Sequence, residues 1–390
     1  MIRRTPIELV ACVLIACAQP RAPVGERAIE YTITGTHPLS IDVSFPEGTT
    51  IEVCATPCRY HYERDAKPIG TLADILLTPR GAHAIRIRAP KSFLTALRRA
   101  GDTYVGTLDE LAAPYAIGVA QSIHEGGTSL DVVAAPGSRA STDAEITAWL
   151  ARSLRAVAKY YQRPPFARTL VTIDGFARDE IFGMADHHGE GSIGLHFGPS
   201  ARVDGDDDWV ATHELLHLAF PFVGRSHAWF SEGMATYVEP IARARAGDLD
   251  VREMWLDFAH GLKRGQPRPG DEGLESNKTR DRTYWGGALF YFVADLELRV
   301  RSGNTRGLEH ALRALHPGDA SIEEVLARAD AATSTTVFRE LYAKYALRTE
   351  AVDLDGWFRR LGIVVNGESV TFDSAAELAA IRETLTKRVE

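Results

Sequence analysis

The stretch "WVATHELLHLAFP", residues 209–221, decides how the second half of the chain folds. It is almost entirely apolar, yet it holds two histidines and a glutamate within five positions, at His213, Glu214 and His217. Burying ionisable groups without partners costs several kcal/mol, so an ordinary core helix would not contain this trio. The composition therefore predicts a buried helix whose ionisable side chains have a functional role.

Helical spacing places His213 and His217 one turn apart on the same face. Two imidazole nitrogens so placed can converge on one metal ion, while Glu214 can reach a water on that metal without ligating it. The H-E-x-x-H pattern is typical of zinc sites in metallopeptidases. The spacing predicts one Zn²⁺ per chain, with Glu214 as a general base.

A third ligand is available downstream in "AWFSEGMATYVE", where Glu232 stands at the start of another predicted helix. The version of the motif with a third histidine needs glycine and histidine where this chain has Phe220 and Val223. A structural zinc site is the alternative, but such sites are usually rich in cysteine and closed. We expect His213, His217 and Glu232 to hold the metal and leave one position for water.

The combination of "HELLH" with "WFSEGMATYVE" resembles the gluzincin zinc metallopeptidases, in particular the glycyl aminopeptidase-like family. The second motif also resembles the alanyl aminopeptidase family. Further on, "TYWGGALFYFVADLELRVRSG" is similar to the helix in which a Tyr-x-Lys-Gly-Ala pattern supplies a catalytic tyrosine. That pattern maps onto Tyr284, with Gly286 in place of the lysine. The resemblance spans about residues 140–390.

The resemblance implies an α+β fold with a thermolysin-like catalytic domain and a mainly helical C-terminal part. It also implies hydrolysis of peptides, with aminopeptidase activity favoured over endopeptidase activity. No Gly-x-Met-Glu-Asn stretch is evident, and Glu190 is the acid placed like the family's amine-binding glutamate. The alternative is a catalytically degenerate relative that serves as a peptide-binding or scaffold lipoprotein.

Several neighbouring residues receive supporting roles in this interpretation. The strand "GSIGLHF" is expected to pair with the substrate backbone as an edge strand. Thr236 is a candidate for orienting the metal ligands, and Asp208 is expected to cap the helix of the opening stretch. His187, His188 and His227 are interpreted as loop residues without a metal role.

The N-terminus has the features of an export signal. Arg3 and Arg4 precede an apolar run that is too short to span a bilayer, and the run ends in "LIAC". This resembles a bacterial lipobox, with Cys17 as the lipidated residue. The prediction is a lipoprotein of the cell envelope, with the outer membrane or periplasm favoured. Simple secretion is the alternative.

Two cysteines remain in the exported chain, Cys54 and Cys58 in "CATPC". An oxidising compartment allows them to close as a local disulfide. A pair of metal ligands is the alternative, but no second pair of suitable spacing stands nearby. A disulfide is therefore predicted.

Charge and patterning set the expected organisation. The net charge of −8 excludes nucleic acid as a main partner, which leaves a peptide or protein substrate and a membrane reached through the lipid. Alternating short apolar runs predict a β-sandwich-like N-terminal domain. The expected segments are a signal with its lipidation cysteine at 1–17, a tether at 18–28, the β-rich domain at 29–140, the catalytic domain at 141–353, and a hairpin and helix at 354–390.

Overall fold

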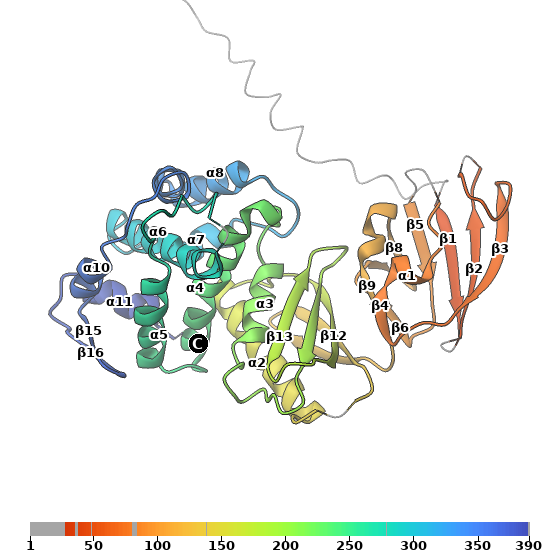
Figure 1. The fold of residues 1–390 in the computed structure, drawn as a ribbon, viewed down its shortest axis with the longest axis horizontal. Coiled ribbons are helices and arrows are strands. Elements are labelled where there is room, and N and C mark those ends of the chain that lie inside the picture. The colour runs from red at the N-terminus through yellow and green to blue at the C-terminus, as the bar shows by residue number, and fades with distance from the viewer. Residues whose placement is uncertain are drawn as a thin grey trace, which may run out of the picture. The chain divides into compact units, whose positions relative to one another are not determined.

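A computed structural model describes residues 28–35, 38–47, 49–79, 84–137, 139–277 and 279–388. The predicted signal and Cys17 lie outside these ranges. The chain forms two compact units, Met1–Ile117 and Gly118–Glu390, which are described separately below (Figure 1). Among the described residues, no helix is both long and apolar enough to cross a membrane.

The first unit is β-rich, as predicted, and contains two sheets. A six-stranded sheet has the order β3-β2-β1-β5-β8-β7, and a three-stranded sheet has the order β4-β9-β6. Alternation decides the buried face: in β2, Leu39, Ile41, Val43 and Phe45 are all buried. The elements are β1 (Ile29–Thr34), β2 (Leu39–Phe45), β3 (Cys58–Arg64), β4 (Ile69–Thr71), α1 (Leu72–Ile75), β5 (Ala84–Arg88), β6 (Phe93–Thr95), β7 (Arg98–Ala100), β8 (Thr103–Thr107) and β9 (Pro114–Ile117).

A disulfide joins Cys54 to Cys58 in this unit. The bond closes the short loop that leads into β3, which begins at Cys58. The two cysteines are therefore paired with each other rather than placed for a metal.

The second unit is built on a five-stranded sheet of order β10-β11-β12-β14-β13. Its strands are β10 (Gln121–Glu125), β11 (Thr128–Ala134), β12 (Arg168–Gly175), β13 (Ile181–Asp186) and β14 (Ser192–Phe197). β11, β12 and β14 are parallel, whereas β13 runs antiparallel to β14. The predicted boundary at 140 is too late, because β10 and β11 pair into this sheet and extend the second unit back to Gly118.

The expected edge strand is also different. β14, the strand of "GSIGLHF", has β12 on one side and β13 on the other, so it cannot accept a substrate strand. The edge next to it is β13. On its free side, the N–H groups of Ile181 and Ala185 donate to Asp207 and Glu214, so an incoming chain would meet the backbone of Gly183 between them.

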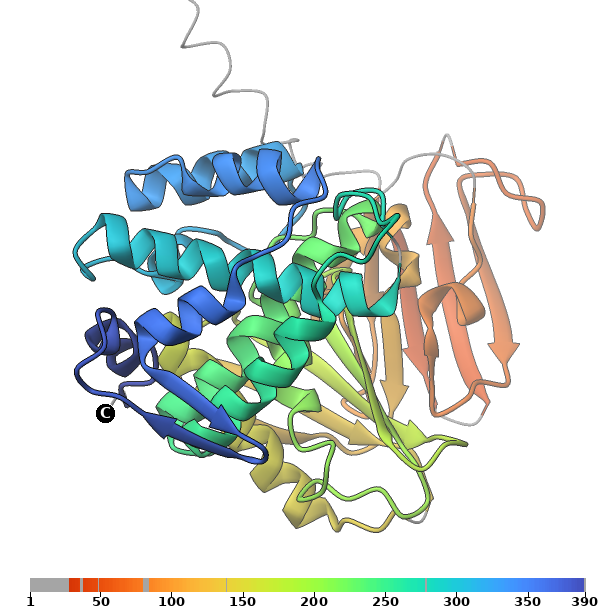
Figure 2. The ribbon, with the colours of Figure 1, turned by 60° about the vertical axis from the view of Figure 1, so that its left-hand side comes forward.

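Helices make up most of the second unit, and those coloured green to blue lie together on one side of the sheet (Figure 2). The α+β class with a helical C-terminal part is thus confirmed. The helices are α2 (Asp143–Tyr161), α3 (Val210–Leu218), α4 (Ala228–Ala246), α5 (Val251–Arg264), α6 (Gly287–Arg301), α7 (Leu308–Arg313), α8 (Ile322–Thr333), α9 (Val337–Leu341), α10 (Leu354–Leu361) and α11 (Ala379–Leu385). The predicted terminal hairpin is present as β15 (Ile363–Asn366) and β16 (Ser369–Phe372).

Two glycines allow α4 and α6 to pack in direct backbone contact. A Cβ added at Gly233 would lie 2.4 Å from Gly287 Cα, and one added at Gly287 would lie 2.1 Å from the carbonyl oxygen of Trp229. A side chain at either position would push the helices apart. This close crossing brings Glu232, next to Gly233, toward Tyr284, which stands just before α6.

The residue at the N-terminus of α3 differs from the predicted cap, Asp208. Asp208 does not cap the helix, because its carboxylate forms an ion pair with Arg243 of α4. The N-cap residue is Trp209, and no side chain caps the helix there. The carbonyl of Asp208 also accepts a hydrogen bond of 2.7 Å from the indole of Trp149. Asp208 therefore ties α3 to α2 and α4.

Candidate active site

His213 and His217 project from the same face of α3, as their spacing predicts. Both side chains are largely buried, and their Nε2 atoms lie 3.2 Å apart. The helix is buried on most sides because its apolar residues, such as Leu215 and Leu216, pack into the core. The apolar packing holds the two imidazoles rigidly toward one point.

Glu232 reaches the same point from the first turns of α4. Its Oε2 lies 3.2 Å from His213 Nε2 and 3.4 Å from His217 Nε2. The three donor atoms thus form a nearly equilateral triangle. Zinc bonds of about 2.0–2.1 Å in a tetrahedron require ligand atoms about 3.3 Å apart. The donor set and its spacing fit one zinc ion.

The electrostatics of the triangle favour a bound cation. Burial raises the pKa of Glu232, but hydrogen bonds with His213 and His217 outweigh it and hold the pKa well below its ordinary value. Burial lowers the pKa of His217, yet the Glu232 carboxylate overcomes this and raises it. Glu232 is therefore ionised throughout the neutral range, as a metal ligand must be.

Glu214 lies on the adjacent face of α3 and is held by β13. Its Oε2 accepts a hydrogen bond of 2.8 Å from the backbone N–H of Ala185. A Cβ added at Gly183 would lie 2.5 Å from Glu214 Cγ, so only glycine leaves room for this side chain. The glutamate is thus positioned beside the triangle without belonging to it, which suits a base rather than a ligand.

Tyr284 also lies next to the triangle, in a π-helical turn at Arg282–Gly286. Its ring is stacked on His213 with centroids 6.3 Å apart. Burial, followed by the negative charges of Glu232 and Glu214, raises the pKa of Tyr284 to about 12. The phenol therefore keeps its proton at neutral pH and can donate a hydrogen bond. Single π-helical turns within helices are frequent at functional sites.

Two residues predicted for this site do not join it. The carboxylate of Glu190 accepts a hydrogen bond of 3.1 Å from Arg168, which also pairs with Asp131 at 2.7 Å. Its charge is already balanced by that guanidinium. The Oγ1 of Thr236 is buried and has no hydrogen-bond partner among the described residues, so no hydrogen bond from it orients Glu232.

The three histidines interpreted as loop residues lie in different surroundings. His188 pairs with Asp186 at 2.7 Å, and His227 pairs with Glu275 at 2.8 Å. His187, directly after β13, is mostly buried. Burial and the nearby His217 lower its pKa to about 4. His187 is therefore a neutral neighbour of the triangle. The sequence analysis did not place it there, although it follows directly after the strand that becomes β13.

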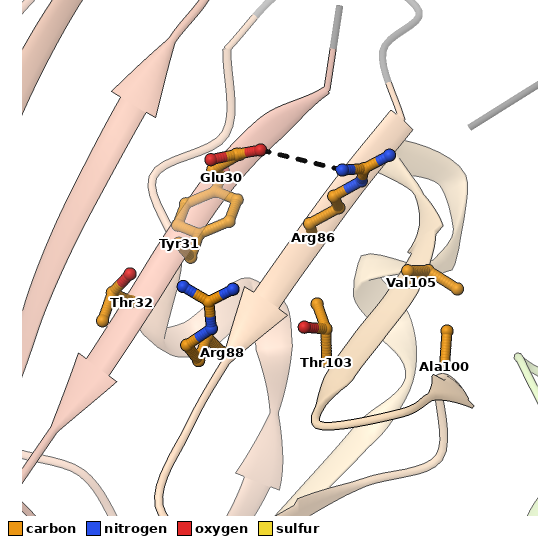
Figure 3. Close-up of a pocket in the computed structure, with 8 residues that line it drawn as sticks. All are labelled: Glu30, Tyr31, Thr32, Arg86, Arg88, Ala100, Thr103 and Val105. Atoms are coloured by element: carbon orange, nitrogen blue, oxygen red, sulfur yellow. Dashed lines mark ion pairs between the residues drawn. The ribbon is translucent and has the colours of Figure 1, made fainter. Parts of the chain in front are cut away.

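A hollow of about 270 Å³ on the first unit is a separate feature (Figure 3). It lies on the water-facing side of the six-stranded sheet, between β1, β5 and β8. Arg86 lies 3.9 Å from Glu30, and Arg88 lies 3.8 Å from Asp102. The charges of these strands are therefore balanced in pairs, as on a solvated sheet face. We place no chemistry there.

No family model matches the chain, and no curated protein matches its sequence. Solved structures do match its fold. An aminopeptidase N family protein from Idiomarina loihiensis has a TM-score of 0.59 at 15% identity, covering 87% of this chain and 79% of that one. An M1 zinc metallopeptidase from Deinococcus radiodurans has a TM-score of 0.46 at 13% identity, covering 85% and 96%. The match to the Idiomarina protein shows that this chain has the fold of the aminopeptidase N family, which confirms at the level of the fold the resemblance to gluzincin aminopeptidases.

Proposed function

We propose that the protein is a zinc-dependent peptidase. The observation that carries this proposal is the triangle of His213, His217 and Glu232, whose atoms are spaced for one zinc ion and flanked by Glu214. The fold of the aminopeptidase N family supports the same conclusion, and a thermolysin-like arrangement of the second unit is part of the proposal. These four side chains and Tyr284 come from α3, α4 and the π-helical turn at Arg282–Gly286, and α4 packs against both of the others.

The residues divide the reaction among them. Bound zinc supplies a Lewis acid that acidifies water and polarises a carbonyl. Glu214 takes a proton from the attacking water and passes it to the leaving nitrogen, so that its own charge is restored. Tyr284, protonated at neutral pH, donates a hydrogen bond to the oxygen of the tetrahedral species.

The substrate backbone is expected to pair with β13. The N–H groups of Ile181 and Ala185 point to the free edge, where Asp207 and Glu214 accept them at 2.8 Å. Because backbone groups alternate along a strand, those of Gly183 point the same way. An extended peptide laid along this edge would pass directly beside Glu214.

We propose more specifically that the peptidase is an aminopeptidase, which the fold supports. An amine anchor needs a carboxylate whose charge is not already balanced, and Glu190 does not meet this condition. Glu190 is therefore not part of this proposal as the amine anchor.

Matched peptides with free and acetylated N-termini test the activity. An aminopeptidase cleaves the free peptide at its first bond and leaves the acetylated one intact. Internal cleavage of the acetylated peptide would show an endopeptidase. Zinc retention without cleavage of either peptide would favour the degenerate, peptide-binding alternative.

We also propose that the protein is an exported lipoprotein anchored through Cys17 in the cell envelope. The support is the basic start, the apolar run and "LIAC" in the sequence. The paired cysteines, Cys54 and Cys58, agree with an oxidising compartment.

A further inference from the structure

Trp209 stands at the first turn of α3 with 38% of its surface exposed. Three other tryptophans, Trp149, Trp229 and Trp255, are only 1–2% exposed, and the remaining two are of intermediate burial. The Trp209 ring meets the ring of the metal ligand His213 edge-on, with centroids 5.3 Å apart. A large apolar surface is therefore left open to water directly beside the candidate metal centre.

The exposure of Trp209 does not come from a loose loop. The carboxylate of Asp207 accepts a hydrogen bond of 2.8 Å from the backbone of Ile181. The carboxylate of Asp208 is held by Arg243. The two residues before Trp209 are thus held in place, and its partly exposed ring costs free energy unless an apolar group covers it.

Phe222 provides a second exposed aromatic ring at the opposite end of α3. It is also 38% exposed, and its ring lies 5.3 Å from that of His187. Its backbone is fixed by hydrogen bonds with Gly318 and Ala320, at 3.0 and 3.1 Å. The backbone that carries this ring is therefore fixed, and part of the ring is open to water.

The two rings lie near opposite ends of the line that a peptide paired with β13 would follow. β13 lies beside α3 (Figure 1) and runs in the same direction, since Ile181 meets Asp207 and Ala185 meets Glu214. A peptide paired with β13 would therefore pass Trp209 near one end, the metal centre in the middle, and Phe222 near the other end. Side chains on either side of the cleaved bond would reach the two rings.

We infer that the candidate active site favours peptides with apolar side chains on both sides of the cleaved bond, with Trp209 and Phe222 as the specificity-determining residues. The inference rests on the proposed peptidase function. An apolar side chain that covers either ring is removed from water, which strengthens its binding by about tenfold or more relative to a charged side chain.

A matched peptide series tests this, with leucine, aspartate or glycine on each side of the cleaved bond. The wild-type protein should prefer leucine to aspartate by about tenfold in kcat/KM on both sides. Trp209→Ala should abolish the preference on one side and Phe222→Ala on the other, through KM and with zinc retained. Trp209→Phe should keep the preference. Leu347→Ala removes a residue that is 61% exposed away from the site, and should change nothing.

Binding to Glu214→Gln, measured by calorimetry with the same peptides, separates this inference from the proposed function. If the wild type cleaves nothing but this variant binds leucine peptides in a way that depends on Trp209, the peptidase proposal fails and the preference for apolar side chains stands. Equal cleavage or binding of leucine and aspartate peptides would overturn the inference. So would an unchanged preference in Trp209→Ala and Phe222→Ala, or loss of preference on the same side in both.

Discussion

The backbone N–H of Ala185 on β13 donates a hydrogen bond of 2.8 Å to Glu214 Oε2. The edge strand that is expected to pair with a substrate is therefore the same strand that orients the proposed general base. The carboxylate accepts this bond through one oxygen, which fixes its direction beside the triangle of His213, His217 and Glu232. The strand β13 would thus position both the substrate backbone and the proposed base, Glu214.

Gly183 should be intolerant of any side chain for this reason. A Cβ there would lie 2.5 Å from Glu214 Cγ, so Gly183→Ala must displace the glutamate or the strand. We expect kcat to fall by about tenfold or more with zinc content unchanged, since a small misplacement of a catalytic group is costly. Gly175→Ala on β12, where nothing lies within 4 Å, is the matched control and should keep full activity. Normal kcat in Gly183→Ala would mean that Glu214 has room to move.

The proton of Tyr284 should remain in place through the alkaline range. Its pKa of about 12 means that the phenol donates its hydrogen bond at pH 7 and still does so at pH 9. Tyr284→Phe should lower kcat by about a hundredfold at every pH in that range and leave zinc bound. A pH–rate profile of both proteins checks this. If the variant changed the alkaline limb instead of the whole curve, the phenol would be titrating and the assigned role would be wrong.

Metal analysis should find about one zinc per chain. His213→Ala removes one corner of the donor triangle, so it should lose most of the metal after purification without added zinc. His61→Ala changes an exposed histidine of the first unit and serves as the control. Stoichiometric zinc in His213→Ala would place the metal elsewhere.

Cys17 should carry the membrane anchor. Cys17→Ser should leave the signal uncleaved or release the protein from membranes, whereas Cys12→Ser, within the signal, should not. Mass spectrometry of the N-terminus distinguishes the outcomes. A mature chain that begins at another, unmodified residue would favour simple secretion.

The metal ligands could be predicted from the sequence because their geometry is local. A helix places His213 and His217 on one face whatever surrounds it. Glu232 lies in a second short motif, "WFSEGMATYVE", which can also be recognised locally. Tyr284 was found only through a resemblance, since its approach to His213 depends on the crossing of α4 and α6 at Gly233 and Gly287.

Other features depend on long-range pairing that no local pattern encodes. The strand at Ser192–Phe197 was predicted to be an edge, but its neighbours β12 and β13 are chosen by the fold of the whole sheet. Alternating runs look alike in either unit, which is why β10 and β11 were assigned to the first. Asp208 looked like a helix cap because its partner, Arg243, lies far along the chain.

Zinc content and peptide turnover of Glu214→Gln, measured on one preparation beside the wild type, test the central claim most directly. The variant removes the base and leaves His213, His217 and Glu232 in place. We predict about one zinc per chain in both proteins, and a loss of at least about a hundredfold in turnover by the variant. Turnover close to that of the wild type, with zinc bound, would contradict the account.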